Sequence, residues 1–403
     1  MKISRLILIG LIGWYCILIS AHYFGQRPMW NDELCVYDNI VHLKPAALFH
    51  QPLLDYQEFP RFYLWCIQQF SLPLHGHLLA LRLFPFLAMM TAFFVWLKVV
   101  RIQSQDIRAL ILFVGCWCAS IPLVYHAGEL KQYSMDVLCS GLFMLFLYRQ
   151  PDLQKQPVLY RSLLFFMPLL GIFSYPVVFI YPLILYNLVR DAYAHRRLPP
   201  ELFFYMAGGL GWVLFVYFFD YRVTLTGTLH TCWNDYFVSF NSMHVFLKSF
   251  GEGISNIIAR WFAEIPRWFK YPARFFVGSG LLFMLINAWK VFKTEGYRFH
   301  SLMPAAFGIF FLHLLFGCLH KYPFGVPRTS LFIAPFLLWM TVLCLQWLKG
   351  KAKVIGTVVE VVFIVYLIFV SVGIARIVFA CNPNLLHTGP GLGGQSELWQ
   401  KGA

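Results

Sequence analysis

Two adjacent carboxylates, Asp32 and Glu33, follow the first apolar run of the chain. Carboxylates beside a membrane lose hydration energy unless they are paired or used in chemistry. One of them could act as a general base that takes a proton from a substrate while its neighbour orients it. The alternative is structural, with Asn31 or Asp32 capping a short interfacial helix over residues 33–43. The residues alone leave both interpretations open.

A second group of polar residues lies in Gly128–Asp136, where a later apolar helix should begin. On a continuous helix Glu129, Tyr133 and Asp136 would share one face, because positions i, i+4 and i+7 do so. Asp136 would then lie about one turn inside the membrane, where a buried carboxylate indicates function. The structural alternative is a Glu129–Lys131 pair beside a helix cap.

Cations are found in two further unusual places. Arg82 lies about two turns inside an apolar run, where it could snorkel outward, bind an anion or pair with Asp136. The second place, rich in Pro and Gly, comes just before a helix and carries Lys321, Tyr322 and Arg328. A helix N-terminus favours anions, and arginine can bind phosphate through two parallel hydrogen bonds. An ordinary turn with interfacial cations is the alternative.

The elements that must position these residues are membrane helices. Of the 403 residues, 59% are hydrophobic and 12% are charged, whereas soluble domains have about 25% charged residues. Several apolar runs approach the roughly 20 residues that cross a bilayer. We therefore expect a single all-α polytopic membrane domain over residues 1–403, with about eleven transmembrane helices. The predicted spans are 6–24, 76–98, 108–126, 132–148, 160–174, 176–190, 201–219, 273–292, 301–319, 329–348 and 354–379.

The basic residues predict an orientation. The net charge of +14 would suit nucleic acid, but its placement favours a membrane and no nucleic acid, because the basic residues form clusters two apolar runs apart. The six clusters contain Lys2 and Arg5; Lys98, Arg101 and Arg108; Arg149, Lys155 and Arg161; Arg190, Arg196 and Arg197; Lys290, Lys293 and Arg298; and Lys349, Lys351 and Lys353. We expect them all to be cytoplasmic, with the N-terminus inside and the first run kept as a signal anchor in the cytoplasmic (inner) membrane.

Two long extracytoplasmic loops follow from this topology, over about residues 25–75 and 220–272. The first should carry interfacial helices. In the second, the stretch from His244 to Phe275 alternates cations with aromatic residues, which predicts helices lying along the outer membrane surface. The cations and aromatic residues that define the stretch are Arg260, Trp261, Arg267, Trp268, Lys270, Tyr271 and Arg274.

The ten cysteines are scattered, mostly within apolar runs where a thiol acts as a small hydrophobe. We expect no metal site. A disulfide could form among the outer cysteines, and the sequence leaves the pairing open. These are Cys35, Cys66, Cys232 and Cys381.

Taken together, these motifs resemble the GT-C membrane glycosyltransferases, in the family-39-like branch related to protein O-mannosyltransferases and aminoarabinose transferases. Trp30–Leu34 matches a Trp-x-Asp-Glu pattern, and Pro52–Trp65 resembles the family's next loop segment. Leu79–Leu87, with Arg82, matches its second helix. Gly128–Asp136 resembles a Q-E-x-R-x-Y motif, and the segment from Tyr322 to Arg328 resembles a late Y-P-F-G-x-x-R loop. The order and spacing agree over about residues 1–350. Lys131 stands where the family has arginine, and Phe59-Pro60-Arg61 also departs from its pattern.

The resemblance implies a GT-C-type bundle that transfers a sugar, with inversion, from a polyprenyl-phosphate donor to an acceptor outside the membrane. It implies that Asp32 is the catalytic base and that Glu33 orients it. Phosphate leaves readily, so no general acid and no cofactor beyond the lipid-linked donor are expected. The residues expected to bind substrate and phosphate are Arg82, Glu129, Lys131, Tyr133, Asp136, Lys321, Tyr322 and Arg328.

Two other classes stay open. A transporter or flippase of lipid-linked sugar would share the cations and a lipid groove but would not need Asp32. A noncatalytic membrane assembly subunit would keep the fold with a decayed site. The acceptor could be a protein, a lipid or a glycan, and the donor sugar could be a hexose or a pentose.

Overall fold

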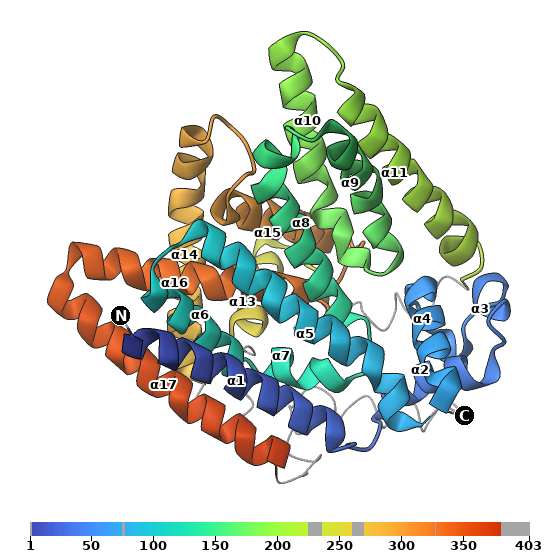
Figure 1. Ribbon diagram of the computed structural model, residues 1–403, viewed down its shortest axis with the longest axis horizontal. Helices are drawn as coiled ribbons and strands as arrows, with labels where there is room; N and C mark the ends of the chain where they lie inside the picture. Colours follow the sequence, from blue (N-terminus) through green and yellow to red (C-terminus); the bar gives the residue numbers. More distant parts are fainter. Residues whose placement is uncertain (1, 75–76, 225–235, 260–269, 327, 380–403) are drawn as a thin grey trace.

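The computed structural model describes residues 2–74, 77–224, 236–259, 270–326 and 328–379 (Figure 1). Over these residues the secondary structure is helical, with no strand. The longer helices are α1 (Lys2–Phe24), α2 (Asn31–His42), α4 (Arg61–Ser71), α5 (Leu78–Gln103), α6 (Ile107–Cys118), α8 (Tyr133–Leu153), α9 (Pro157–Leu169), α10 (Tyr181–His195), α11 (Pro200–Val216), α13 (Met243–Ala259), α14 (Lys270–Thr294), α15 (Leu302–Cys318), α16 (Ala334–Lys351) and α17 (Lys353–Phe379).

Shorter helical turns connect these helices. They are α3 (Ala47–His50), η1 (Leu54–Tyr56), η2 (Leu72–Leu74), α7 (Ile121–Tyr125), η3 (His126–Gly128), η4 (Leu170–Ile172), η5 (Tyr175–Phe179), η6 (Tyr217–Tyr221) and η9 (Leu331–Ile333). The turn η6 is a π-helix that continues directly from α11.

Seven of the described helical segments are long and apolar enough to cross a membrane. The pair α6 with α7–η3, bent by 70°, would make eight. The protein is therefore a multi-pass membrane protein. Every predicted span coincides with a helical segment, but eleven crossings are not confirmed, because α9–η4 and α15 are shorter apolar helices and α8 does not meet the same test.

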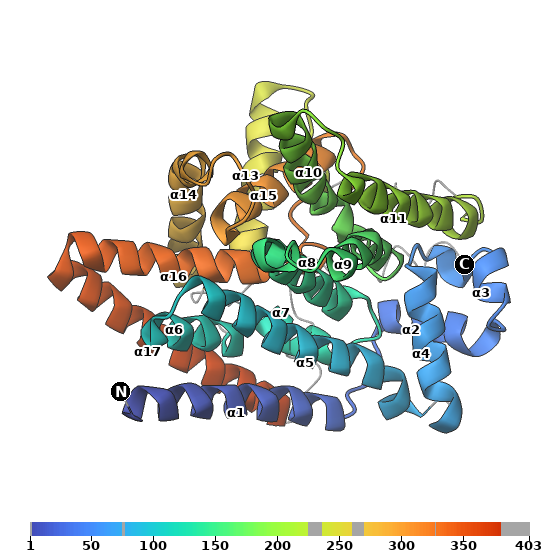
Figure 2. The same ribbon diagram turned by 45° about the horizontal axis from the view of Figure 1, so that its top comes forward.

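The helix α16 lies at the centre of the bundle, with 72% of its most apolar window buried. The corresponding share is 17% for α1 and for α11. Their outward side chains are large and apolar, which suits contact with lipid. Figures 1 and 2 show α1 and α17 along one flank of the molecule, and α9, α10 and α11 together on another.

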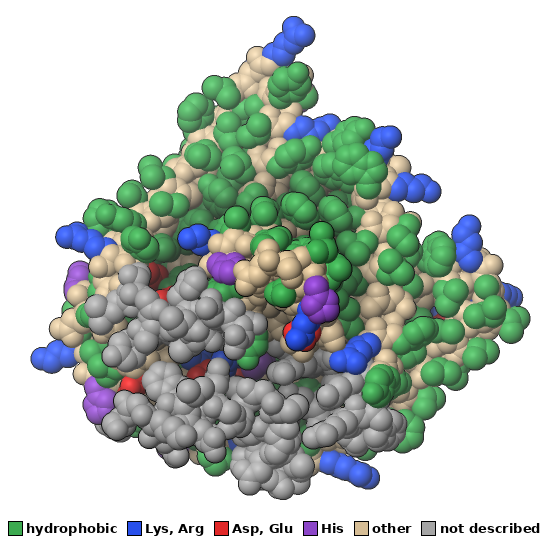
Figure 3. Space-filling model, turned by 180° about the vertical axis from the view of Figure 1, so that it is seen from behind, with side chains coloured by type: hydrophobic (Ala, Val, Ile, Leu, Met, Phe, Trp, Pro, Cys, Tyr) green, Lys and Arg blue, Asp and Glu red, His purple; other side chains and the backbone are tan. Residues whose placement is uncertain are grey.

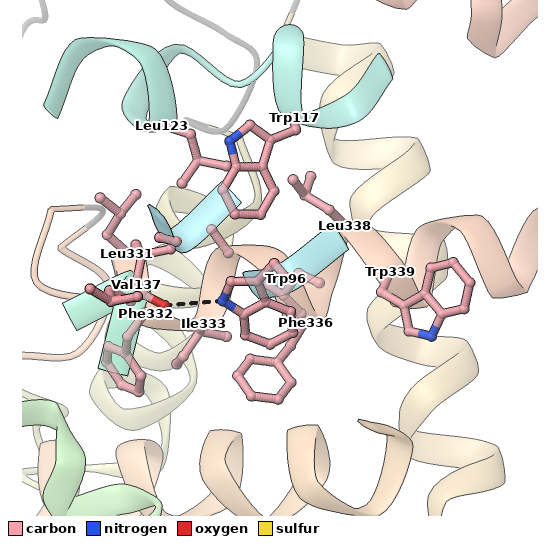
Figure 4. Packing of buried hydrophobic residues seen from close by; sticks show 14 of the residues in the cluster. Trp96, Trp117, Leu123, Val137, Leu331, Phe332, Ile333, Phe336, Leu338 and Trp339 are labelled. Carbon is pink, nitrogen blue, oxygen red and sulfur yellow. Dashed lines mark hydrogen bonds between the residues drawn. The ribbon is translucent and has the colours of Figure 1, made fainter. Parts of the chain in front are cut away.

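Large aromatic side chains fill the centre of the bundle (Figure 4). Trp96, Trp117 and Trp339 are each fully buried. The indole of Trp96 donates a 3.0 Å hydrogen bond to the carbonyl of Val137 in α8. Because a buried indole N–H needs an acceptor, this bond fixes the position of α8 along α5. The neighbour of Val137 is Asp136, so the same contact sets the depth of that carboxylate.

The described part of the first loop, residues 25–74, is mostly helical (Figure 1), and buried polar side chains hold it. Asn39 accepts from the Leu54 amide at 2.7 Å and donates to the Leu54 carbonyl at 3.2 Å. Gln68 of α4 donates to two carbonyls at the end of α2. Arg61 forms an ion pair with Asp220 at 3.1 Å, which joins the loop to the end of α11. The start of α2 is thereby fixed relative to the bundle.

The predicted helix in the second loop is present as α13, which covers the first part of the stretch from His244 to Phe275. Residues 260–269, with both tryptophans of that stretch, lie outside the described residues. α13 packs closely on the later loop at Gly253, opposite Gly325. A Cβ on Gly325 would come 2.4 Å from the Gly253 Cα, and Gly325 has φ +87°. Both facts require glycine at position 325.

Candidate functional site

The central feature of the site is an ion pair between Asp32 and Arg328, which are 296 residues apart in the chain. The Arg328 Nη1 donates to Asp32 Oδ2. The Asp32 side chain is 32% exposed and that of Arg328 is 19% exposed, so the pair is partly buried. Asp32 lies in the first turn of α2, and Arg328 follows the turn at Gly325. The bundle thus brings together two residues that the sequence predicted in separate motifs.

Glu33 has a different environment from Asp32. Its carboxylate is fully buried and lies between two guanidinium groups. Arg27 approaches to 2.6 Å, and Arg82 makes two contacts of 3.1 and 3.2 Å. The Leu130 amide donates to Glu33 Oε1 at 3.1 Å. Glu33 therefore attaches the start of α2 to α5 and to the segment before α8.

Helix geometry explains why the two neighbouring carboxylates separate. Adjacent residues on an α-helix point about 100° apart, so Asp32 and Glu33 contact different partners. Glu33 contacts Arg27, Arg82 and the Leu130 amide rather than Asp32. Glu33 positions the helix that carries Asp32.

The structural alternative, in which Asn31 or Asp32 caps the helix, is wrong. The N-cap of α2 is Trp30, and no side chain bonds the first amides. The Trp30 indole N–H instead donates to Glu129 at 3.0 Å, and its ring lies 5.4 Å from the Arg328 guanidinium carbon. This is a distance at which a cation is attracted to an aromatic face. Trp30 therefore links Arg328 to Glu129.

Glu129 pairs with His126, contrary to the alternative that paired it with Lys131. The expected shared face with Tyr133 and Asp136 is also corrected, because α8 begins at Tyr133 and Glu129 has extended backbone geometry. Burial raises the pKa of Glu129, but the charges of His126 and Arg27 outweigh it and lower the pKa to about 2. Glu129 is a buried, ionised acceptor between His126 and Trp30.

Lys131 lies on the same side as the central ion pair. Its ammonium donates to Gln57 at 2.9 Å and lies 5.3 Å from the Phe59 ring centroid. Its own carbonyl accepts from the Tyr63 hydroxyl at 2.8 Å. Burial lowers the pKa of Lys131, and the nearby Asp32 carboxylate offsets only part of this effect. For Arg328, burial lowers the pKa, but attraction to Tyr133 and Asp32 is stronger and raises it overall. Both cations therefore interact electrostatically with Asp32, and Arg328 also contacts it directly.

Asp136 lies deeper, in the first turn of α8, and is 2% exposed. Its Oδ1 makes no close hydrogen bond, and the nearby Ser174 hydroxyl, which interacts with this carboxyl, makes none either. Tyr133, which is one turn earlier, interacts electrostatically with both Asp32 and Asp136. Arg82 does not pair with Asp136, because Glu33 binds its guanidinium.

The remaining predicted residues separate into two groups. The Tyr322 hydroxyl donates to the Thr329 carbonyl at 3.0 Å, so Tyr322 holds the loop that carries Arg328. Lys321 is exposed, and its side chain forms no ion pair with the described residues.

Figure 3 shows basic, acidic and histidine side chains together near the middle of one face, with hydrophobic side chains above them.

Sequence reasoning missed Arg27 and His126. Arg27 follows the end of α1, contacts Glu33 and stacks on the Tyr125 ring at 4.5 Å. His126 lies three residues before Glu129, a spacing that could have signalled the pair. Arg27 gave no such signal, because its partner is chosen by the packing of α1, α2 and α5.

Metal and disulfide chemistry gain no structural support. Across the described ranges, no three His, Cys, Asp or Glu side chains are grouped in a way that could hold a metal ion. Cys35 and Cys66 are free thiols, so they do not form the disulfide considered above. Cys232 and Cys381 lie outside the described residues.

Comparison with known proteins found no match to a family model, a curated protein or a solved structure. The resemblance to the GT-C enzymes therefore rests on the motifs alone.

Proposed function

We propose that this protein is a glycosyltransferase that moves one sugar from a polyprenyl-phosphate donor to an acceptor at the membrane surface. The observation that carries the proposal is the contact of Asp32 with Arg328, beside Lys131. A carboxylate with one cation in contact and a second nearby provides the groups for a reaction in which a proton is removed while a phosphate departs.

The proposed step balances as follows. An acceptor O–H attacks the anomeric carbon of the donor from the face opposite the phosphate. The new C–O bond forms as the bond from that carbon to the phosphate oxygen breaks, which inverts the anomeric centre. The acceptor proton passes to the Asp32 carboxylate, and the electron pair leaves with polyprenyl phosphate. Arg328 and Lys131 stabilise the added negative charge on that phosphate.

The topology belongs to the same proposal. Eleven spans in the cytoplasmic (inner) membrane, with a cytoplasmic N-terminus, would place residues 25–75 and 220–272 on the outer side. Asp32 and Arg328 would then face the extracytoplasmic space, where a protein, lipid or glycan acceptor is available. The six basic clusters support this orientation, because they lie between alternate pairs of helices.

The test is sugar transfer by the full-length protein in lipid nanodiscs. Radiolabelled polyprenyl-phosphate hexoses and pentoses are supplied with a membrane extract as the acceptor source. Asp32→Asn should reduce transfer by roughly 10²–10⁴-fold, the usual contribution of a positioned base. Asp38→Asn is the matched control, because Asp38 lies on the same helix with its side chain 45% exposed. Transfer that is equal in both variants would refute Asp32 as the base.

A second function is favoured by one observation, the buried Asp136 with an unpartnered oxygen. Intramembrane carboxylates of this kind serve as proton carriers in transporters. A proton-coupled flippase of lipid-linked sugar would lose transport on Asp136→Asn and keep it on Asp32→Asn. The glycosyltransferase makes the opposite prediction for Asp32, so the two variants distinguish the functions.

A further inference from the structure

The two groups with opposite tasks in the proposed reaction neutralise each other in this structure. Arg328, proposed to bind phosphate, donates its hydrogen bond to Asp32, the proposed base. While this hydrogen bond is in place, the Asp32 oxygen that it occupies is not free to accept a proton from a substrate. In this structure Arg328 therefore blocks the proposed base, and Asp32 occupies the arginine that is proposed to bind phosphate.

We infer that Arg328 exchanges partners during the reaction, leaving Asp32 for the donor phosphate, so that binding of the donor exposes the base. This inference rests on the proposed function and adds that the donor must bind before the base can act. A phosphate offers more than one oxygen to the guanidinium, which favours the exchange. The released carboxylate oxygen is free to accept a proton only when a donor is in place.

The surroundings of Arg328 permit such an exchange. The ion pair is partly exposed, with Asp32 at 32% and Arg328 at 19%, so separating its charges costs less than separating those of the buried cluster at Glu33. The Trp30 ring lies beside the guanidinium and can keep it in the site while its anionic partner changes. Trp30 is itself fixed by its hydrogen bond to Glu129. Lys131 stays where Gln57 holds it and provides a second positive charge.

Glu33 does not take part in the exchange. Its two arginines are 8% and 1% exposed, and its own side chain is fully buried. Breaking such a pair leaves a buried charge without compensation, which costs about 3–5 kcal/mol. The site therefore has one labile ion pair at Asp32 and one fixed ion-pair cluster at Glu33, on adjacent residues of α2.

The exchange also returns the site to its starting state. After transfer Asp32 carries the acceptor proton, and the phosphate has gained one negative charge and holds Arg328 more strongly. When Asp32 releases its proton to water, its carboxylate again competes for Arg328. This competition weakens the hold on polyprenyl phosphate and helps the product leave.

The experiment measures binding, so no acceptor is needed. Farnesyl phosphate is titrated into the full-length protein in detergent, and the heat of binding gives Kd for the wild type, Asp32→Asn and Asp38→Asn. Removing the competing carboxylate should make Asp32→Asn bind about 5- to 10-fold more tightly, where tenfold corresponds to about 1.4 kcal/mol. Asp38→Asn should bind like the wild type, which excludes a general effect of lost negative charge. Farnesol, which lacks phosphate, should show no difference among the three.

The outcomes separate the two ideas. If farnesyl phosphate binds all three proteins equally, or binds Asp32→Asn more weakly, the exchange is wrong while the proposed function can stand. If farnesyl phosphate binds none of them, the proposed donor class is wrong. Asp32→Ser removes the same charge with a smaller side chain and repeats the test independently, so that one poorly folded variant does not decide the result.

Discussion

Glu33→Gln should destabilise the protein strongly, although Asp32→Asn should not. Glu33 is fully buried and contacts Arg27 at 2.6 Å and Arg82 at 3.1 Å. Glutamine has nearly the same shape, so the change removes one negative charge and leaves two buried guanidinium groups facing each other. Removing one partner from a buried ion pair costs about 3–5 kcal/mol. We expect a loss of this size in the free energy of unfolding.

The assay is reversible unfolding of the purified protein in mixed micelles with increasing denaturing detergent, followed by tryptophan fluorescence. Asp38→Asn, on the same helix but exposed, should change the free energy of unfolding by less than about 0.5 kcal/mol. The double variant Glu33→Gln with Arg82→Met removes one cation as well and should recover part of the loss. A loss below about 1 kcal/mol for Glu33→Gln would refute the argument that this carboxylate is structural.

Three further predictions test other parts of the structure. Gly325→Ala should impair farnesyl phosphate binding and lower the melting temperature, because a Cβ there would come 2.4 Å from Gly253 Cα in a backbone with φ +87°; binding and melting equal to those of the wild type would contradict this. The pKa of Glu129 is lowered from 4.5 to about 2, so its charge stabilises the fold above pH 4.5 and this contribution is lost as the pH falls towards 2. Acid unfolding of Glu129→Gln should show a shallower pH dependence in that window, and an unchanged slope would disprove the assignment. Cysteines introduced at exposed positions in residues 45–55 should react with an impermeant thiol reagent from outside intact cells, and labelling only after permeabilisation would reverse the proposed orientation.

The helices could be predicted from the sequence because apolar length determines them locally. Each predicted span coincides with a helical segment, and the helix after Trp30 is present as α2. Length alone could not show that the third apolar run bends by 70°, since the bend depends on contacts with other helices. The number of crossings was therefore harder to predict than the positions of the helices.

The site could be predicted only as a set of residue types. The motifs at Asp32 and Arg328 were both identified, but the choice of partners is made by tertiary packing. Arg82 could have snorkelled, bound an anion or paired with Asp136, and the packing of α2 on α5 gives it Glu33. Glu129 was assigned to a helix that begins four residues later, at Tyr133. Local periodicity contains no information about such choices.

The bend between α6 and α7 has a consequence for how the protein is assembled. In the segment between this bend and α8, backbone carbonyls accept hydrogen bonds from side chains of other helices. Tyr15 of α1 donates to the Leu123 carbonyl, and Ser134 of α8 to the His126 carbonyl. These bonds satisfy backbone groups that a continuous helix would otherwise satisfy, so the shape of this segment depends on its neighbours. It reaches its final shape only after α8 has been synthesised, and the loop that bears Arg328 comes later still. The contact between Asp32 and Arg328 is therefore among the last parts of the fold to form.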